Sequence, residues 1–294
     1  MTTYPKPGQD MVWNGSVGAH WADYADRYDA MLAELNDPLF FAASIDAHDR
    51  VLDIGCGAGA TTRIAASLAP HGHAVGVDIS QPLLTEARAR AAAEGVPNTS
   101  YERGDAQEHP FPPGSYDVAI SRGGVMFFAD HRAAFDHLAR ALRPGGRLAF
   151  VCPQPTDPSS DEARAFGLFA KLLEEGGHTE PPAPETVAAH QAMASLADPD
   201  RVRAALGGYQ DVTVTPVTGS CFWGEDPEDA VSFILSRTPD RTVSAATRAA
   251  MAQALVPYAT ERGVRLRFQV WLVTAVRPYG ETHGEPHGEP RGKI

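Results

Sequence analysis

The sequence contains little lysine and little cysteine, and both shortages limit what the protein can be. Lysine occurs only at positions 6, 171 and 293, and 37 acidic residues outnumber 25 basic ones, which gives a formal net charge of −12. Such a charge repels phosphate backbones and anionic lipid surfaces, so we expect neither nucleic acid nor a membrane as a partner. Cys56, Cys152 and Cys221 lack the paired spacing of a disulfide framework or metal site, so we expect no metal and a reducing compartment.

Long apolar runs are also missing. No segment approaches the roughly 20 apolar residues that a membrane-spanning helix needs. The opening MTTYPKPGQD lacks the charged flank and apolar centre of a signal peptide, so we expect an unexported cytoplasmic protein. A hydrophobic content of 43% is enough for the core of one large domain with insertions.

Short apolar runs alternate with helical patterns through the first half of the chain. The expected strands are 50–54, 74–78, 99–103, 116–121 and 147–152, and the expected helices are 61–68, 82–94 and 133–142. Alternation with short connections is typical of a parallel sheet covered by helices on both faces, an α/β doubly wound fold.

The flanking segments predict additional parts. The spacing over 19–35 predicts one amphipathic helix that stops near Pro38. After the core, the patterns predict strands at 211–216 and 266–276 and helices at 161–175, 199–206, 227–236 and 244–258. We expect an N-terminal helical cap (1–48), a cofactor-binding core (49–152), remaining strands with helical lid or substrate insertions (153–277) and a disordered tail (278–294).

Three alternating glycines follow the first expected strand, in the order Gly55-x-Gly57-x-Gly59. Bare backbone between a strand and a helix places N–H groups at the sheet edge where open α/β sheets bind ligands. The spacing differs from the dinucleotide fingerprint and lacks the Gly-Lys-Ser/Thr of a phosphate-binding loop. Asp53, inside the strand, would repel a pyrophosphate but could hold a cationic amine.

The stretch Asp53-Ile-Gly-Cys-Gly-Ala-Gly59 resembles the glycine motif of class I S-adenosylmethionine-dependent methyltransferases. Further landmarks follow in the family's order: Val75-Gly-Val-Asp78-Ile-Ser80, Gly104-Asp105-Ala106, Ser121-Arg-Gly-Gly-Val-Met-Phe-Phe-Ala-Asp130 and Leu142-Arg-Pro-Gly-Gly146. The N-terminal YADRYDAML is similar to the small-molecule branch that includes ubiquinone and menaquinone biosynthesis enzymes. In place of an expected bulky residue in the fourth-strand loop, this chain has Gly123.

The resemblance implies a mostly parallel, seven-stranded Rossmann-like sheet with an antiparallel last strand and S-adenosylmethionine as cofactor. It implies that the acid at the second strand's end accepts both ribose hydroxyls and that the third motif reads the adenine edge. The expected cofactor-binding residues are Asp53, Gly55, Gly57, Gly59, Asp78, Ile79, Asp105, Ala106 and Ser121.

The acceptor side is less determined. Met126 and Phe127 follow the fourth strand and either line an apolar substrate pocket or pack in the core. His20 is a candidate base for a hydroxyl or acidic carbon, against a packing role, and no catalytic residue is assigned. Arg122 could hold an acceptor carboxylate or pair with a neighbouring acid. Trp21 and Tyr28 could close over the cofactor or anchor their helix.

The leading hypothesis is S-adenosylmethionine-dependent methylation of a small-molecule acceptor on oxygen, nitrogen or carbon, by in-line transfer in a dehydrated pocket. The alternatives are a nicotinamide-dependent oxidoreductase, which the glycine spacing disfavours, and a cofactor-binding protein without methyl transfer. Enzymes that methylate exocyclic or amide nitrogens usually carry an Asn/Asp-Pro-Pro-Tyr-like motif where this chain has Ser121-Arg-Gly-Gly. Sequence alone decides neither the acceptor nor the oligomeric state.

Overall fold

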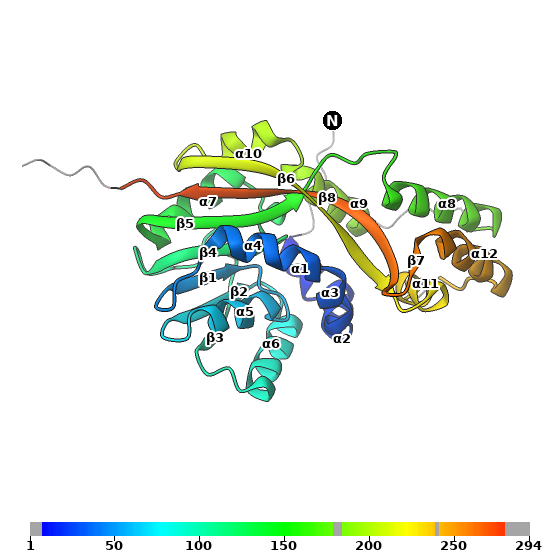
Figure 1. Ribbon diagram of the computed structural model, residues 1–294, viewed down its shortest axis with the longest axis horizontal. Coiled ribbons are helices and arrows are strands. Elements are labelled where there is room, and N and C mark those ends of the chain that lie inside the picture. Colours follow the sequence, from blue (N-terminus) through cyan, green and yellow to red (C-terminus); the bar gives the residue numbers. More distant parts are fainter. Residues whose placement is uncertain (1–7, 179–183, 239–240, 280–294) are drawn as a thin grey trace, which may run out of the picture.

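The computed structural model describes residues 8–178, 184–238 and 241–279. Its centre is one mixed sheet with the order β3-β2-β1-β4-β5-β8-β6 (Figure 1). The strands are β1 (Arg50–Ile54), β2 (His73–Asp78), β3 (Thr99–Arg103), β4 (Tyr116–Arg122), β5 (Leu142–Pro153), β6 (Gln210–Gly224), β7 (Ala259–Thr260) and β8 (Gly263–Val276). Strands β1 to β5 are parallel to one another, and β8 runs antiparallel to both β5 and β6. The predicted sheet is confirmed, with two-residue β7 pairing β8 as an addition.

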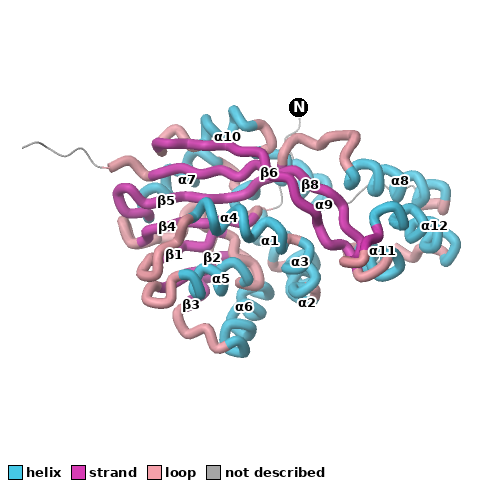
Figure 2. The backbone as a smooth tube through the Cα atoms, viewed as in Figure 1, coloured by secondary structure: helices cyan, strands magenta, loops and turns pink. Residues whose placement is uncertain are grey.

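Helices cover both faces of this sheet because its strands are apolar on both sides. Val51 and Leu52 are neighbours in β1, yet they belong to separate buried clusters on opposite faces. One face is covered by α4 (Asn36–Ala43) and α5 (Ala60–Leu68), and the other by α7 (His131–Ala141) and α10 (Pro199–Ala205) (Figures 1 and 2). Helix α6 (Gln81–Glu94) connects β2 to β3 and ends at Gly95, which adopts the left-handed conformation that favours glycine.

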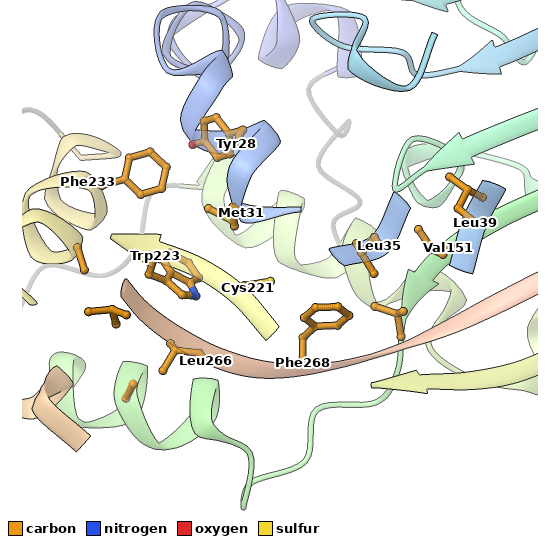
Figure 3. Close-up of a cluster of buried hydrophobic side chains, with 14 of the residues drawn as sticks. Tyr28, Met31, Leu35, Leu39, Val151, Cys221, Trp223, Phe233, Leu266 and Phe268 are labelled. Carbon is orange, nitrogen blue, oxygen red and sulfur yellow. The ribbon is translucent and has the colours of Figure 1, made fainter. Parts of the chain in front are cut away.

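The ends of β6 and β8 run beyond the sheet and carry a second helical layer (Figure 2). This layer contains α8 (Asp161–Glu175), α11 (Pro227–Ser236) and α12 (Ala245–Leu255), with α9 (Pro184–Met193) on the connection. Figure 3 shows how the N-terminal helices meet it, with Tyr28 and Met31 facing Phe233, Trp223 and Leu266. One apolar cluster thus joins the N-terminal helices, the sheet and this outer layer.

The N-terminal segment corrects a prediction. In place of one helix over 19–35, the chain forms α1 (Gln9–Trp13), α2 (Ser16–Asp23), α3 (Ala25–Met31) and a 3₁₀ turn, Ala33–Leu35. Pro38 does not stop a helix, because it lies in the first turn of α4, where no intrahelical N–H bond is lost. Breaks between the short helices let this segment bend around the edge of the sheet.

Other elements differ mainly in length. β5 begins at Leu142, ahead of the expected strand, and β6 is much longer than the predicted 211–216. The helix predicted at 244–258 is α12 followed by a 3₁₀ turn, Val256–Tyr258. Within the described ranges, no helix is long and apolar enough to cross a bilayer. The predicted tail lies outside the described residues from position 280 onward.

Candidate functional site

The glycine loop leaves β1 with all three glycines at positive φ, at 66°, 54° and 79°. A Cβ on Gly55 would lie 2.7 Å from the Gly124 Cα, and one on Gly59 would lie 2.8 Å from the Tyr101 ring. A Cβ on Gly57 would meet nothing within 4 Å. The outer two glycines therefore permit close packing, whereas Gly57 leaves its surroundings open for a ligand.

Asp53 is fully buried one residue before the end of β1. Its Oδ2 accepts hydrogen bonds from the hydroxyls of Thr61 and Thr62, both at 2.7 Å. Its Oδ1 has no hydrogen-bond partner among the described residues. Burial raises the pKa of this carboxyl from 3.8 to about 6, and the two threonine bonds oppose the shift. An unsatisfied buried carboxylate oxygen favours a donor from outside the protein.

Asp78 ends β2 beside the same loop. Its Oδ2 accepts the Gly57 N–H at 2.8 Å, and its Oδ1 accepts the Ser80 N–H at 2.8 Å. Burial raises the pKa of Asp78, while these backbone bonds stabilise the carboxylate. Each oxygen retains capacity for a further bond, so Asp78 can fix the loop and still accept from a ligand.

A pocket opens between the glycine loop and the N-terminal helices. Gly55, Cys56 and Gly57 form its floor, and Trp21 and Tyr28 contribute to its wall. These two rings stack in parallel, with centroids 3.6 Å apart. The pocket measures about 60 Å³, far below the roughly 300–1,000 Å³ of typical small-molecule sites. The structure is therefore closed over the loop, and a ligand of cofactor size needs the cover to move.

Helices α2 and α3 cover this pocket. Sequence reasoning missed that the junction of α1 and α2 anchors this cover. Ser80 Oγ donates to the Trp13 carbonyl at 2.6 Å. Asn14 donates to the Ile79 carbonyl at 3.1 Å and accepts the Gln81 N–H at 2.9 Å. The N-terminal segment thus docks directly on the turn that follows Asp78. A lone asparagine between helices carries no sequence signal for such a long-range contact.

The third strand brings the next predicted residues to the same edge. The Gly104 N–H donates to the Asp78 carbonyl at 3.0 Å. Asp105 Oδ1 accepts the Gln107 N–H at 3.0 Å, and Ala106 is buried. Asp105 and Ala106 therefore follow β3 next to the end of β2, outside the small closed pocket.

Ser121 is fully buried at the carboxyl end of β4. Its hydroxyl donates to the Ile54 carbonyl at 2.7 Å and accepts the Gly124 N–H at 3.1 Å. These bonds hold the β4 loop against the end of β1. Ser121 therefore supports the loop. Its direct contact with the cofactor stays a prediction.

Met126 and Phe127 lie in a 3₁₀ turn after β4 and are half-buried. The Phe127 ring packs edge-to-face on Trp13, 5.3 Å between centroids. The Met126 carbonyl accepts a bond from Ser195 Oγ at 2.8 Å. Both residues therefore lie at the ligand edge of the sheet, and Phe127 packs against the N-terminal segment.

Arg122 lines the pocket but is already paired, donating to Asp29 at 3.0 Å and to Asn36 at 2.8 Å. This arrangement agrees with the pairing alternative for Arg122. Cys56 is buried, which raises its thiol pKa well above the usual value and makes it a poor nucleophile. Across the described ranges, no three His, Cys, Asp or Glu side chains gather as a metal site requires.

His20 lies behind the pocket wall. Its Nδ1 is 3.2 Å from the Tyr28 hydroxyl, and its Nε2 is 2.9 Å from Ser236 Oγ. Burial lowers the pKa of His20, and the nearby Arg237 charge adds to the effect. The imidazole is therefore neutral at pH 7 and reaches the pocket only through Tyr28.

A family model described as a methyltransferase domain matches residues 51–146. Demethylmenaquinone methyltransferase of Thermus thermophilus is 34% identical over 164 residues, which cover 52% of this chain and 70% of that enzyme. The chain belongs to the class I S-adenosylmethionine-dependent methyltransferases. S-adenosylmethionine is accordingly its cofactor.

Further relatives agree with this family assignment. Nocamycin O-methyltransferase of Saccharothrix syringae is 38% identical over 148 residues, 50% of this chain and 51% of that enzyme. The solved YcgJ protein of Bacillus subtilis has the same fold, with a TM-score of 0.51 at 23% identity over 84% of this chain and all of that one. The chain spans between about half and three-fifths of the length of the first relatives it matches.

The residues present fit the family's cofactor. The unpartnered Oδ1 of Asp53 suits an ammonium group, and the open space at Gly57 admits a ligand against the main chain. Asp78 retains the lone pairs that a pair of hydroxyls requires. The fit rests on the acceptor atoms and the open backbone at the strand ends. The N-terminal cover occupies none of these positions.

Proposed function

We propose that this protein catalyses methyl transfer from S-adenosylmethionine to a small-molecule acceptor on oxygen, nitrogen or carbon. The observation that carries the proposal is the open backbone at Gly57, flanked by the buried carboxylate of Asp53 and the half-buried carboxylate of Asp78. A dinucleotide would bring a pyrophosphate beside these charges, which disfavours the oxidoreductase alternative.

Each strand end has its own part in holding the cofactor. Asp53 Oδ1 would accept from the amino-acid ammonium, Gly57 would allow close approach, and Asp78 would accept from the ribose hydroxyls. Asp105 and Ala106 would meet the adenine edge, with Ile79 beside them. Gly55, Gly59 and Ser121 would keep the loops in register, since their surroundings are filled by protein.

The cofactor supplies an electrophilic methyl group on a sulfonium. The chain's own contribution is alignment and exclusion of water, which can lower a barrier by roughly 7–11 kcal/mol. Trp21 and Tyr28 would close the pocket wall, and Met126 and Phe127 would line the acceptor side. For a hydroxyl acceptor, neutral His20 could take the proton through the Tyr28 hydroxyl.

The remaining parts of the proposal concern organisation and location. We assign residues 49–152 to cofactor binding, 1–48 to the cap and 153–277 to acceptor binding. The net charge of −12 supports action on small molecules without nucleic acid or membrane, and the three buried free thiols support a cytoplasmic location.

Two measurements test this function. Isothermal titration should detect S-adenosylhomocysteine binding, with NADH as the control for the oxidoreductase alternative. Labelled S-adenosylmethionine, incubated with the protein and a metabolite extract, should yield labelled small molecules. Absence of S-adenosylhomocysteine affinity, or binding of NADH in its place, would refute the proposal. Cofactor binding with no labelled product from any extract would favour a binding protein without transfer.

A further inference from the structure

A second pocket is lined by residues of α11, of α12 and of the segment between them. Figure 1 shows these two helices side by side in the outer helical layer. It measures about 310 Å³. Its lining residues are Ser232, Leu235, Ser236, Arg241, Val243 and Arg248. The hydroxyls of Ser232 and Ser236 already donate to the carbonyls of Glu228 and Phe233, both at 2.7 Å. The donors of this cavity are therefore its two guanidinium groups.

The charge of this pocket is positive and locally uncompensated. Arg241 and Arg248 are half-buried, and among the described residues neither has a carboxylate within 4.0 Å. Arg248 donates to Ser232 Oγ at 2.9 Å and can donate further. Many other arginines of this acidic protein are paired, as Arg122 is with Asp29. An arginine fork without a carboxylate partner is suited to an oxyanion.

The backbone of α12 also favours an anion in this pocket. Helix α12 begins beside the pocket, with Ser244 as its N-cap and no acidic residue in its first turn. Its N-terminus carries a partial positive charge that favours an anion. Arg248 belongs to the first turns of this helix, so the side-chain charge and the helix dipole act at the same end.

A chain of hydrogen bonds leads from this pocket to the cofactor pocket. Ser236 Oγ lines the first and contacts His20 Nε2 at 2.9 Å. His20 Nδ1 contacts the hydroxyl of Tyr28, which lines the second. The two pockets thus lie on either side of the His20 side chain.

We propose that the α11–α12 pocket binds an oxyanionic group, a carboxylate or a phosphate, of the methyl acceptor. The proposal rests on the proposed methyl transfer and adds the substrate class to it. Arg241 and Arg248 donate to the anion, and the reacting end of the acceptor lies toward Tyr28. Neutral and cationic acceptors would leave both guanidinium groups without a partner.

The first experiment measures anion binding by the full chain saturated with S-adenosylhomocysteine. Inorganic phosphate and acetate are titrated separately, to distinguish the two oxyanions. The R241Q/R248Q double variant should weaken binding of the preferred anion roughly tenfold or more and leave S-adenosylhomocysteine affinity unchanged. The R201Q/R203Q variant on α10 removes the same charge at a remote site and should behave as the parent. Equal anion binding in parent and R241Q/R248Q, or none in the parent, overturns the proposal.

A second measurement follows His20 directly. In protein carrying ¹⁵N-labelled histidine, the anion that binds should shift the His20 imidazole resonance, because Ser236 joins the ring to the pocket. The R241K/R248K variant keeps both charges without the arginine fork and should shift it less at equal anion concentration. An unchanged His20 resonance at saturating anion refutes the link between the pockets.

The third measurement separates this proposal from the proposed function. Labelled product formed from a metabolite extract is passed over an anion-exchange resin. We expect the product to be retained and its yield to fall in R241Q/R248Q but not in R201Q/R203Q. Labelled product that flows through unretained overturns the anion assignment and leaves methyl transfer standing. No product together with no S-adenosylhomocysteine binding refutes the proposed function itself.

Discussion

The carboxylate of Asp78 accepts the backbone N–H of Gly57 at 2.8 Å and so joins the end of the second strand to the loop after the first. Asp78 therefore has a structural role in addition to the expected contact with ribose. The same carboxylate also accepts the Ser80 N–H, at the turn where the N-terminal segment docks. The side chain of Asp78 therefore connects the glycine loop to the turn on which the N-terminal cover docks.

Asp78→Ala tests this double role. We expect S-adenosylhomocysteine affinity to fall at least tenfold, because the paired acceptors are lost and the Gly57 amide is freed. The free energy of unfolding should fall by about 1–3 kcal/mol, since two partly buried N–H groups lose their partners. Calorimetry and denaturant unfolding measure the two effects. Asp78→Asn, which keeps one acceptor oxygen, should lie between; unchanged affinity in the alanine variant would contradict the ribose assignment.

Asp53→Asn should stabilise the free protein above pH 7 while weakening cofactor binding. Burial raises the carboxyl pKa to about 6, so the folded state binds this proton more tightly than the unfolded state. The stability that the folded parent gains from protonated Asp53 is complete below about pH 4 and is lost as the pH rises through about 6. Because Asp53→Asn removes the buried charge, it should raise the free energy of unfolding by about 1–3 kcal/mol at pH 7.5.

The control for Asp53 is the pH dependence itself. The advantage of Asp53→Asn in denaturant unfolding should shrink as pH falls from 7.5 to 5. Parent affinity for S-adenosylhomocysteine should also fall below about pH 6, where Asp53 takes up its proton. A stability difference that is constant across this range would refute the raised pKa.

Gly57→Ala and Gly59→Ala should distinguish a glycine that leaves space for the ligand from one that permits close packing. Both add a Cβ at positive φ, which costs about 1 kcal/mol. At Gly57 the Cβ meets no protein atom, so the main loss should be cofactor affinity. At Gly59 it meets Tyr101, so thermal stability should fall further. Equal melting temperatures, with S-adenosylhomocysteine affinity unchanged in Gly57→Ala, would contradict the assigned roles.

Asn14→Ala tests the N-terminal cover. Asn14 bonds the backbone of Ile79 and Gln81, so its removal should loosen the segment that closes the 60 Å³ pocket. We expect stopped-flow fluorescence to show faster association and faster release of S-adenosylhomocysteine. Asn98→Ala, which removes an asparagine remote from the cover, is the control. Slower association in Asn14→Ala would show that the cover does not limit entry.

Local patterns predicted the core well. The run Arg50–Ile54 and the glycines after it are signals within a few residues of one another, and the structure has the strand and turn there. The break of 19–35 into short helices could not be predicted in this way, because its periodicity remains helical throughout. The breaks follow from packing around Trp223 and Phe233, which are distant in the chain.

The candidate site shows the same division. Asp53 and Asp78 were found because each ends an apolar strand beside a recognisable motif. Trp13, Asn14 and Ser80 were missed because their contacts span more than sixty residues and none has an unusual neighbour. Arg241 and Arg248 carry no motif, and their significance comes from the cavity in which both lie.

By itself the sequence determined the alternating strands, the glycine loop and the acids at the strand ends, because periodicity and turn chemistry are local properties of a chain. Only the tertiary structure decided that Asp53 keeps one oxygen unsatisfied, that Asn14 anchors the N-terminal segment to the turn after β2, and that His20 stands between two cavities. These depend on which side chains meet across the fold. Such meetings follow from the burial of apolar surface by the whole chain at once.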